Sequence, residues 1–238
     1  MIEAELSVAV SPIGNTFGRL MGPNCDEHVV MTGSHTDSVI SGGHFDGIVG
    51  VVCAIEALRV LNSVKDELLH PIEVVDWMGE EASRFGLSLI GSKAFMGELK
   101  PESLLLKDNQ DTTLAQALKS VESLEHFKGK ISSQWNEESA LEAMRNSRAD
   151  TSKIHSYVEL HVEQAGFLEE NAMPIGIVSG AAMPTRWAFE VVGEQAHSGT
   201  TPMERRKNAL VAASEFVLLV DHVCKSESEH GTSVQSPD

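Results

Sequence analysis

Cysteine is scarce in this sequence, and the spacing of the few cysteines argues against two common kinds of site. Cys25, Cys53 and Cys224 are an odd number at wide spacings, with no CxxC pair and no zinc-finger histidines beside them. We therefore expect free thiols and no disulfide framework. Any bound metal ion must then be held by histidine and carboxylate side chains.

Long apolar runs and an excess of positive charge are also missing. No segment approaches the roughly 18 apolar residues of a membrane span, and the opening MIEAELSVAV lacks the pattern of a secretory signal. The 18 basic and 35 acidic side chains give a formal net charge of -17, which repels nucleic acid and anionic lipid surfaces. We therefore expect a globular, cytoplasmic protein with no nucleic-acid or membrane partner.

Alternating strand and helix patterns predict an α/β fold. Residues 28–34 (HVVMTGS) are predicted to form a buried strand, and apolar side chains repeat at helical spacing over residues 48–61. Further strands are predicted at residues 72–77 (IEVVDW) and 155–164 (HSYVELHVEQ). Functional groups in open α/β sheets collect beyond the carboxyl ends of the strands, so the loops after these strands are the expected site.

The second half of the chain is less regular. Surface helices are expected at residues 114–127 and 135–144, a half-exposed strand at 185–194 (TRWAFEVVGE), and a helix at 209–223 followed by a frayed tail. Because the composition changes near Gly180, we predict a first domain at residues 1–179 and the beginning of a second at 180–238.

The first cluster of candidate residues follows the strand at 28–34. His35 and Asp37 form an H-x-D pair, and Asp46 lies in the glycine-rich stretch beyond them. A neutral histidine nitrogen with carboxylate oxygens suits zinc, manganese, cobalt or nickel. Taken alone, an Asp at this position is explained equally well as a turn residue.

Two adjacent carboxylates follow the strand at 72–77. In an extended backbone Glu80 and Glu81 point to opposite sides, so one can bind a metal ion while the other faces a water molecule. Repulsion would raise the pKa of one of them unless a cation neutralises the pair. The alternative is a solvated surface pair.

Two histidines complete the candidates. Alternation in YVELHVEQ would place Glu159, His161 and Glu163 on one side of a strand, which is also what an edge strand with a wet face would show. His197, in the loop EQAHSGTTPM, could donate a hydrogen bond to a substrate oxygen or a developing oxyanion. An ordinary loop histidine is the simpler alternative.

Five segments in one order carry a family resemblance: GSHTDSVISGGHFDGIVGV, GEEASRFGLSLIGSKAFMG, ELHVEQAGFLE, PIGIVSG and GEQAHSGTTPMERRKNAL. Together they resemble the N-carbamoyl-L-amino-acid hydrolase and allantoate amidohydrolase family, whose members are dinuclear metallohydrolases of the aminoacylase and carboxypeptidase type. The resemblance implies a three-layer α/β catalytic domain of the zinc-exopeptidase type. It also implies that residues 180–238 begin a smaller α+β ferredoxin-like lid and dimerisation domain, and that the whole protein is a homodimer.

The resemblance also assigns the metal ligands. By position it implies two divalent ions, zinc or manganese, cobalt or nickel, with His35, Asp46 and His161 holding one of them. Asp46 would bridge to the second ion, which Glu81 would also bind.

The remaining roles concern proton transfer, the orientation of a ligand and substrate binding. The resemblance implies that Glu80 is the general base and that Asp37 orients His35. Gln164 and His197 would contact the substrate, with His197 reaching across a dimer interface.

The implied substrates are small molecules with a carbamoyl or ureide group. The first is an N-carbamoyl-L-amino acid, and the alternative is allantoate or ureidoglycolate; HSGTTPM and the segment around AAMPTRW are nearer to the carbamoylase side. Family members are longer, and neither their final metal-binding histidine in a GAGHD-like motif nor their substrate-binding Asn and Arg have a counterpart here. We therefore expect a truncated chain, for which a third hypothesis is an inactive remnant that retains only metal binding or dimerisation.

Overall fold

The computed structural model describes residues 1–24, 26–121, 137–180 and 187–231. They form two compact units, Met1–Ile175 and Gly176–Asp238. The predicted domain boundary near residue 180 stays a prediction. Parts of the predicted helices at 114–127 and 135–144, and the AAMPTR segment, lie outside the described residues.

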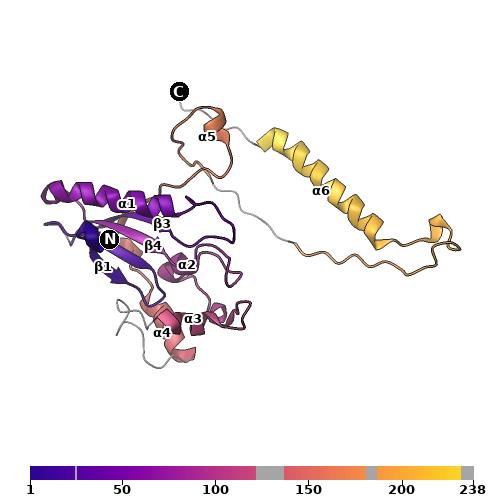
Figure 1. The fold of residues 1–238 in the computed structure, drawn as a ribbon, viewed down its shortest axis with the longest axis horizontal. Helices are drawn as coiled ribbons and strands as arrows, with labels where there is room; N and C mark the ends of the chain where they lie inside the picture. The colour runs from indigo at the N-terminus through magenta and orange to yellow at the C-terminus, as the bar shows by residue number, and fades with distance from the viewer. Residues whose placement is uncertain (25, 122–136, 181–186, 232–238) are drawn as a thin grey trace. The chain divides into compact units, whose positions relative to one another are not determined.

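The first unit is built on a sheet of five strands in the order β1-β2-β4-β3-β5 (Figure 1). Their bounds are β1 Ser7–Val10, β2 Thr16–Leu20, β3 Val29–His35, β4 Ile72–Trp77 and β5 Ile154–Val158. The β1–β2 and β2–β4 pairs are antiparallel, and β3 runs parallel to both β4 and β5. This arrangement confirms the predicted α/β fold, with the carboxyl ends of β3, β4 and β5 at one edge.

One face of the sheet is covered by α1 (Ile48–Leu61), whose bounds match the helix predicted from apolar spacing (Figure 1). Ala54 and Leu58 of this helix pack against Leu20 and Val74 of the sheet. The helix therefore uses its apolar stripe to bury one side of the central strands.

The other face packs against α2 (Ile90–Met96). Phe95 of this helix contacts the rings of Phe17 and Trp77, beside the buried Met31 and Val75. With α1 on the opposite face, the sheet is the middle of three layers.

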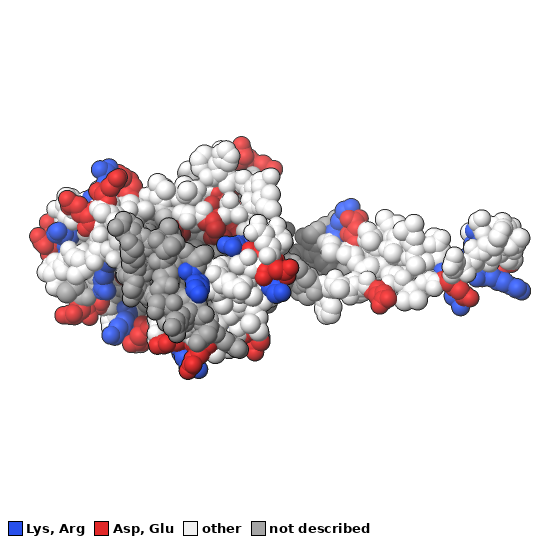
Figure 2. Space-filling model, turned by 60° about the horizontal axis from the view of Figure 1, so that its bottom comes forward, with Lys and Arg blue, Asp and Glu red and all other residues white. Residues whose placement is uncertain are grey.

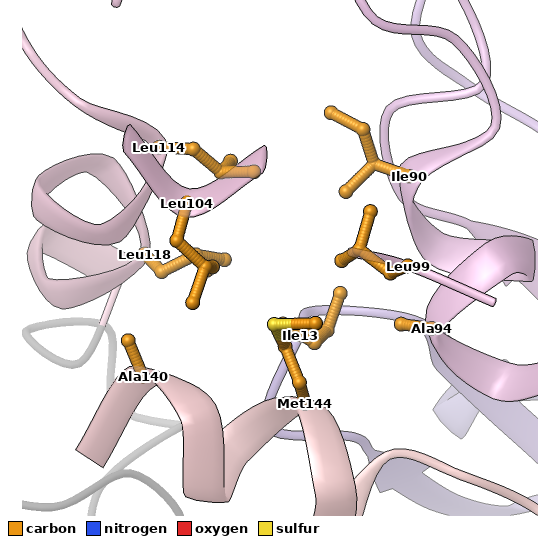
Figure 3. Packing of buried hydrophobic residues seen from close by; sticks show 9 residues of the cluster. All are labelled: Ile13, Ile90, Ala94, Leu99, Leu104, Leu114, Leu118, Ala140 and Met144. Atoms are coloured by element: carbon orange, nitrogen blue, oxygen red, sulfur yellow. The ribbon is translucent and has the colours of Figure 1, made fainter. Parts of the chain in front are cut away.

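A second core lies beyond α2, where α3 (Leu114–Val121) and α4 (Glu137–Asn146) meet. Its side chains point toward one another (Figure 3). The cluster consists of Ile13, Ile90, Ala94, Leu99, Leu104, Leu114, Leu118, Ala140 and Met144. Because Ile90 begins α2, this core supports the loop between β4 and α2.

Short helices complete the described elements. They are η1 Ile2–Ala4, η2 Asn62–Glu67, η3 Pro101–Leu105, η5 Thr151–Lys153, α5 Phe167–Glu170 and η6 Met203–Arg205.

The third predicted strand is shorter than expected. β5 ends at Val158, which pairs with Thr32 of β3, so the prediction that Glu159, His161 and Glu163 share one side of a strand is wrong. A strand persists only where a neighbour supplies ladder hydrogen bonds, and that pairing stops at Val158. His161 therefore lies in a loop.

The second unit contains α6 (Ala209–Gly231), which extends past the predicted end at residue 223 into the expected frayed tail. The predicted strand at 185–194 is wrong for its described part, because residues 187–194 form no strand. No described strand lies beside them within this unit, and the Trp187 side chain is 76% exposed. No described helix is both long and apolar enough to cross a membrane.

Surface charge follows the composition. Figure 2 shows acidic side chains spread around the edge of the first unit, with basic side chains lying singly or in small groups among them. The excess of acidic over basic residues in the sequence is thus distributed and not gathered in one patch on this face.

Candidate metal centre

His35 ends β3 and is buried beneath the glycine-rich loop that follows it. A Cβ at Gly47 would lie only 2.4 Å from the His35 ring, and the φ of Gly47 is +69°. Glycine therefore satisfies both the backbone conformation and the close approach at this position. Its neighbour Asp46 is brought to the same side of the site.

His35, Asp46 and His161 come together from three parts of the chain. Each offers one ligand atom, and these atoms all lie within 4.8 Å of one another. The Nε2 atom of His161 is 3.3 Å from Oδ1 of Asp46, and the centroids of the His35 and His161 rings are 6.0 Å apart. Among the residues that the structure describes, this is the single group with the composition and spacing of a metal site.

The first turn of α1 brings the His161 loop close. A Cβ at Gly50 would lie 2.3 Å from the carbonyl oxygen of Leu160, so a larger residue would push this loop away. The missing side chain of Gly50 thus helps to set where His161 lies.

The chemistry of the three groups fits a first-row divalent ion. Nδ1 of His35 lies 2.8 Å from the backbone carbonyl oxygen of Asp37, so it carries the proton that it donates. The lone pair is then on Nε2, which is the nitrogen available to a metal ion. Two imidazole nitrogens with a carboxylate oxygen form a common ligand set for zinc and related ions.

The Asp37 carboxylate makes contacts that the H-x-D pattern did not indicate. Its carboxylate accepts hydrogen bonds from the backbone N–H groups of Glu80, at 3.1 Å, and Glu81, at 3.0 Å. The same carboxylate is 3.7 Å from Nδ1 of His35. Asp37 thus links the loop after β3 with the loop after β4.

The Glu80 loop is closed at its base by backbone hydrogen bonds, including Leu89 N–H to Glu80 O at 2.8 Å. Asn15, which is fully buried, donates to Gly91 O and accepts from Met78 N–H. Sequence reasoning missed Asn15, because an Asn directly after a glycine is typical of a surface turn.

The electrostatics of Glu80 suit a group that moves a proton. Its carboxylate lies 3.7 Å from Nε2 of His35. Burial raises the pKa of Glu80; His35 opposes this rise, whereas the negative charges of Glu81, Asp37 and Asp46 add to it. A carboxylate with a raised pKa is a stronger base.

Gln164 and Glu81 both lie next to the group of His35, Asp46 and His161, but in different ways. Gln164 donates a hydrogen bond from Nε2 to Oδ2 of Asp46 at 2.9 Å, so it lies at the centre. Glu81 adjoins the centre through its backbone, but its carboxylate does not belong to the group of His35, Asp46 and His161.

His197 lies in the second unit, whose placement relative to the first is not determined. Its Nδ1 atom accepts hydrogen bonds from the N–H groups of Gly199, at 3.0 Å, and Thr200, at 3.2 Å. An accepting Nδ1 puts the proton of the neutral ring on Nε2, so the free nitrogen is a donor.

Known proteins resemble the chain over most of its length. Residues 31–237 match peptidase family M20/M25/M40. An N-carbamoyl-L-amino-acid amidohydrolase of Pseudomonas sp. (strain NS671) is 39% identical over 227 residues, which are 95% of this chain and 51% of the relative. Allantoate deiminase 2 of Glycine max is 34% identical over 232 residues, which are 97% of this chain and 45% of the relative.

A solved structure of a related protein also matches the fold of this chain. A hydantoinase/carbamoylase family amidase from Burkholderia ambifaria matches with a TM-score of 0.68 and 30% identity, over 95% of this chain and 50% of that one. The chain thus spans about half the length of these relatives. The resemblance predicted from the five sequence segments is confirmed, and the chain belongs to peptidase family M20/M25/M40.

Proposed function

We propose that this chain carries the metal-binding part of an amidohydrolase that cleaves the carbamoyl C–N bond of an N-carbamoyl-L-amino acid. The observation that carries the proposal is the convergence of His35, Asp46 and His161 within 4.8 Å, with Glu80 beside them. The similarity to an N-carbamoyl-L-amino-acid amidohydrolase supports the substrate class.

Two divalent ions are proposed at this centre. His35 through Nε2, Asp46 and His161 would hold the first, while Asp46 and Glu81 would contribute to the second. Bound ions of this kind lower the pKa of a coordinated water and polarise the substrate carbonyl.

The protein side chains then handle the proton. Glu80 would accept a proton from the attacking water and deliver it to the leaving nitrogen as the C–N bond breaks. The released carbamic acid decomposes to carbon dioxide and ammonia. Asp37 keeps the Glu80 backbone in place by accepting hydrogen bonds from the N–H groups of Glu80 and Glu81.

Two further residues are proposed to contact the substrate. His197 presents an Nε2–H group that can donate to the oxyanion formed at the carbonyl, because its Nδ1 is occupied by backbone donors. Gln164 is already bonded to Asp46 and would reach the substrate from the rim of the centre. A homodimer, in which His197 acts across the interface, remains part of this proposal.

The second candidate is a ureide hydrolase that acts on allantoate or ureidoglycolate with the same groups. The similarity to an allantoate deiminase over 97% of the chain favours it. Both candidates use the same centre, so a substrate comparison must separate them.

The test combines metal analysis with an ammonia assay on N-carbamoyl-L-amino acids and on allantoate. The proposal is supported if the wild type binds metal and releases ammonia, and if Glu80→Gln keeps the metal but loses ammonia release. Glu98 is exposed, so the control variant Glu98→Gln should leave both metal content and ammonia release unchanged. Metal binding without ammonia release from any ureide would instead identify an inactive remnant. Absence of tight metal binding would contradict the proposed centre altogether.

A further inference from the structure

Hydrogen bonds connect the carboxyl ends of three strands just before the candidate ligands. Nε1–H of Trp77 donates to the Tyr157 hydroxyl at 3.0 Å, and that hydroxyl donates to Oε2 of Glu159 at 2.7 Å. The hydroxyl of Ser34 donates to Oε1 of Glu159 at 2.6 Å. Both oxygens of one carboxylate are therefore engaged, each by a donor from a different strand.

The members of this network adjoin the centre in sequence. Ser34 directly precedes His35, Glu159 comes two residues before His161, and Trp77 ends β4 shortly before Glu80. None of the three has a role in the proposed chemistry. Their side chains instead connect the three strands from which the site groups project.

The His161 loop needs such a connection, because the sheet does not fix it. The ladder between β3 and β5 ends with the Thr32–Val158 pair, and Glu159 is the first residue beyond it. The Glu159 carboxylate reaches back to Ser34, which is fully buried at the end of β3. A short hydrogen bond to a charged acceptor is among the stronger side-chain contacts.

Neighbouring atoms leave the Ser34 side chain little freedom. A Cβ at Gly50 would lie 2.8 Å from Cβ of Ser34, so α1 packs directly on this residue. On the other side of the carboxylate, burial and the hydrogen bond to Glu159 raise the pKa of Tyr157, so its hydroxyl keeps the proton that it donates. The carboxylate is thus bonded to Ser34, which is held by packing, and to Tyr157, whose hydroxyl also accepts a hydrogen bond from Trp77.

We propose that Glu159 is a positioning residue that sets the spacing between His35 and His161 through its bonds to Ser34 and Tyr157. The link to metal binding rests on the proposed function. The positioning of the two rings does not, because it is a property of the metal-free chain.

The first test therefore uses metal-free protein. Crystal structures of the wild type and of Glu159→Ala are compared for the distance between the centroids of the His35 and His161 rings, which is 6.0 Å in the wild-type chain. The proposal expects that the His161 ring moves away from His35, or becomes disordered, in Glu159→Ala. An unchanged ring pair in a correctly folded Glu159→Ala protein would overturn it.

The second test measures Co²⁺ affinity and the Co²⁺ absorption spectrum. Glu159→Ala should weaken binding by about 10–100-fold, the range typical when a residue that orients a metal ligand is removed. Glu159→Gln keeps a polar group at the same place and should lose less than about 10-fold. Ser34→Ala should resemble Glu159→Ala, while the exposed Glu98→Ala should leave affinity and spectrum unchanged.

The outcomes separate the two proposals. If the wild type binds no Co²⁺ but the rings separate in Glu159→Ala, the proposed function fails and the positioning role stands. If the wild type binds Co²⁺ and Glu159→Ala binds it equally well with the same spectrum, the positioning role is wrong while the metal centre stands.

Discussion

Gly47→Ala should disrupt the metal centre through a single added methyl group. The new Cβ would lie 2.4 Å from Cε1 and Nε2 of His35, whereas ordinary contacts begin near 3.4 Å, so the ring must move by roughly 1 Å. A zinc–nitrogen bond is about 2.0–2.1 Å long, and a shift of this size removes the nitrogen from bonding distance. We expect Co²⁺ or Zn²⁺ affinity to fall by about 100-fold, measured by competition with a chromogenic chelator.

A matched control separates the clash from backbone strain. Gly86 also has a positive φ, +66°, but a Cβ there would have no atom within 4 Å. Gly86→Ala should lower the free energy of unfolding by about 1–2 kcal/mol, because a non-glycine residue is strained at positive φ. Gly47→Ala should lower it further, because its methyl group also collides with the buried His35 ring. Only Gly47→Ala should lose metal affinity, and equal affinities for the two variants would show that the His35 ring does not depend on the space left by Gly47.

Three further predictions concern Glu73 and Asp37 of the first unit and His197 of the second. Burial raises the pKa of Glu73, against the charge of Arg19, so the stability due to this carboxyl is present below its ordinary value of 4.5 and is lost as the pH rises through the raised pKa. Urea unfolding as a function of pH should therefore give a flatter profile for Glu73→Gln; parallel profiles would contradict this. Asp37→Ala removes the acceptor for the N–H groups of the Glu80 loop and should lower the free energy of unfolding by about 1.5–3 kcal/mol, a loss that the same urea method measures and that an unchanged midpoint would exclude. Long-range ¹H–¹⁵N NMR at alkaline pH should show His197 protonated at Nε2, because backbone donors occupy Nδ1, and a proton on Nδ1 would contradict the proposed donor role.

Local patterns in the sequence predict the elements that carry a clear apolar signal of their own. The helix at 48–61 and the strand at 72–77 were predicted with their observed bounds, since apolar spacing reports burial directly. The β1–β2 pair is missed although its two strands are close in sequence, because β1 has no buried residue and only exposed and half-buried positions alternate along it. β5 ends earlier than predicted and residues 187–194 form no strand, because a segment does not itself show where pairing with a neighbour stops.

The candidate site shows the same division. Polar residues at the carboxyl ends of strands pointed to His35 and Glu80, because topology brings those ends together. No local pattern indicates that the Asp37 carboxylate accepts hydrogen bonds from two backbone N–H groups, or that Asn15 and Glu159 connect separate segments. Such contacts depend on the tertiary fold, whereas spacing along the chain reports only local structure.

Anomalous diffraction from crystals soaked in Zn²⁺ shows whether His35, Asp46 and His161, from three separated segments, share one metal ion. We expect a peak about 2.0–2.2 Å from Nε2 of His35, a carboxylate oxygen of Asp46 and a ring nitrogen of His161. Zinc bound elsewhere, with these three side chains free of metal, would mean that they do not form a metal centre.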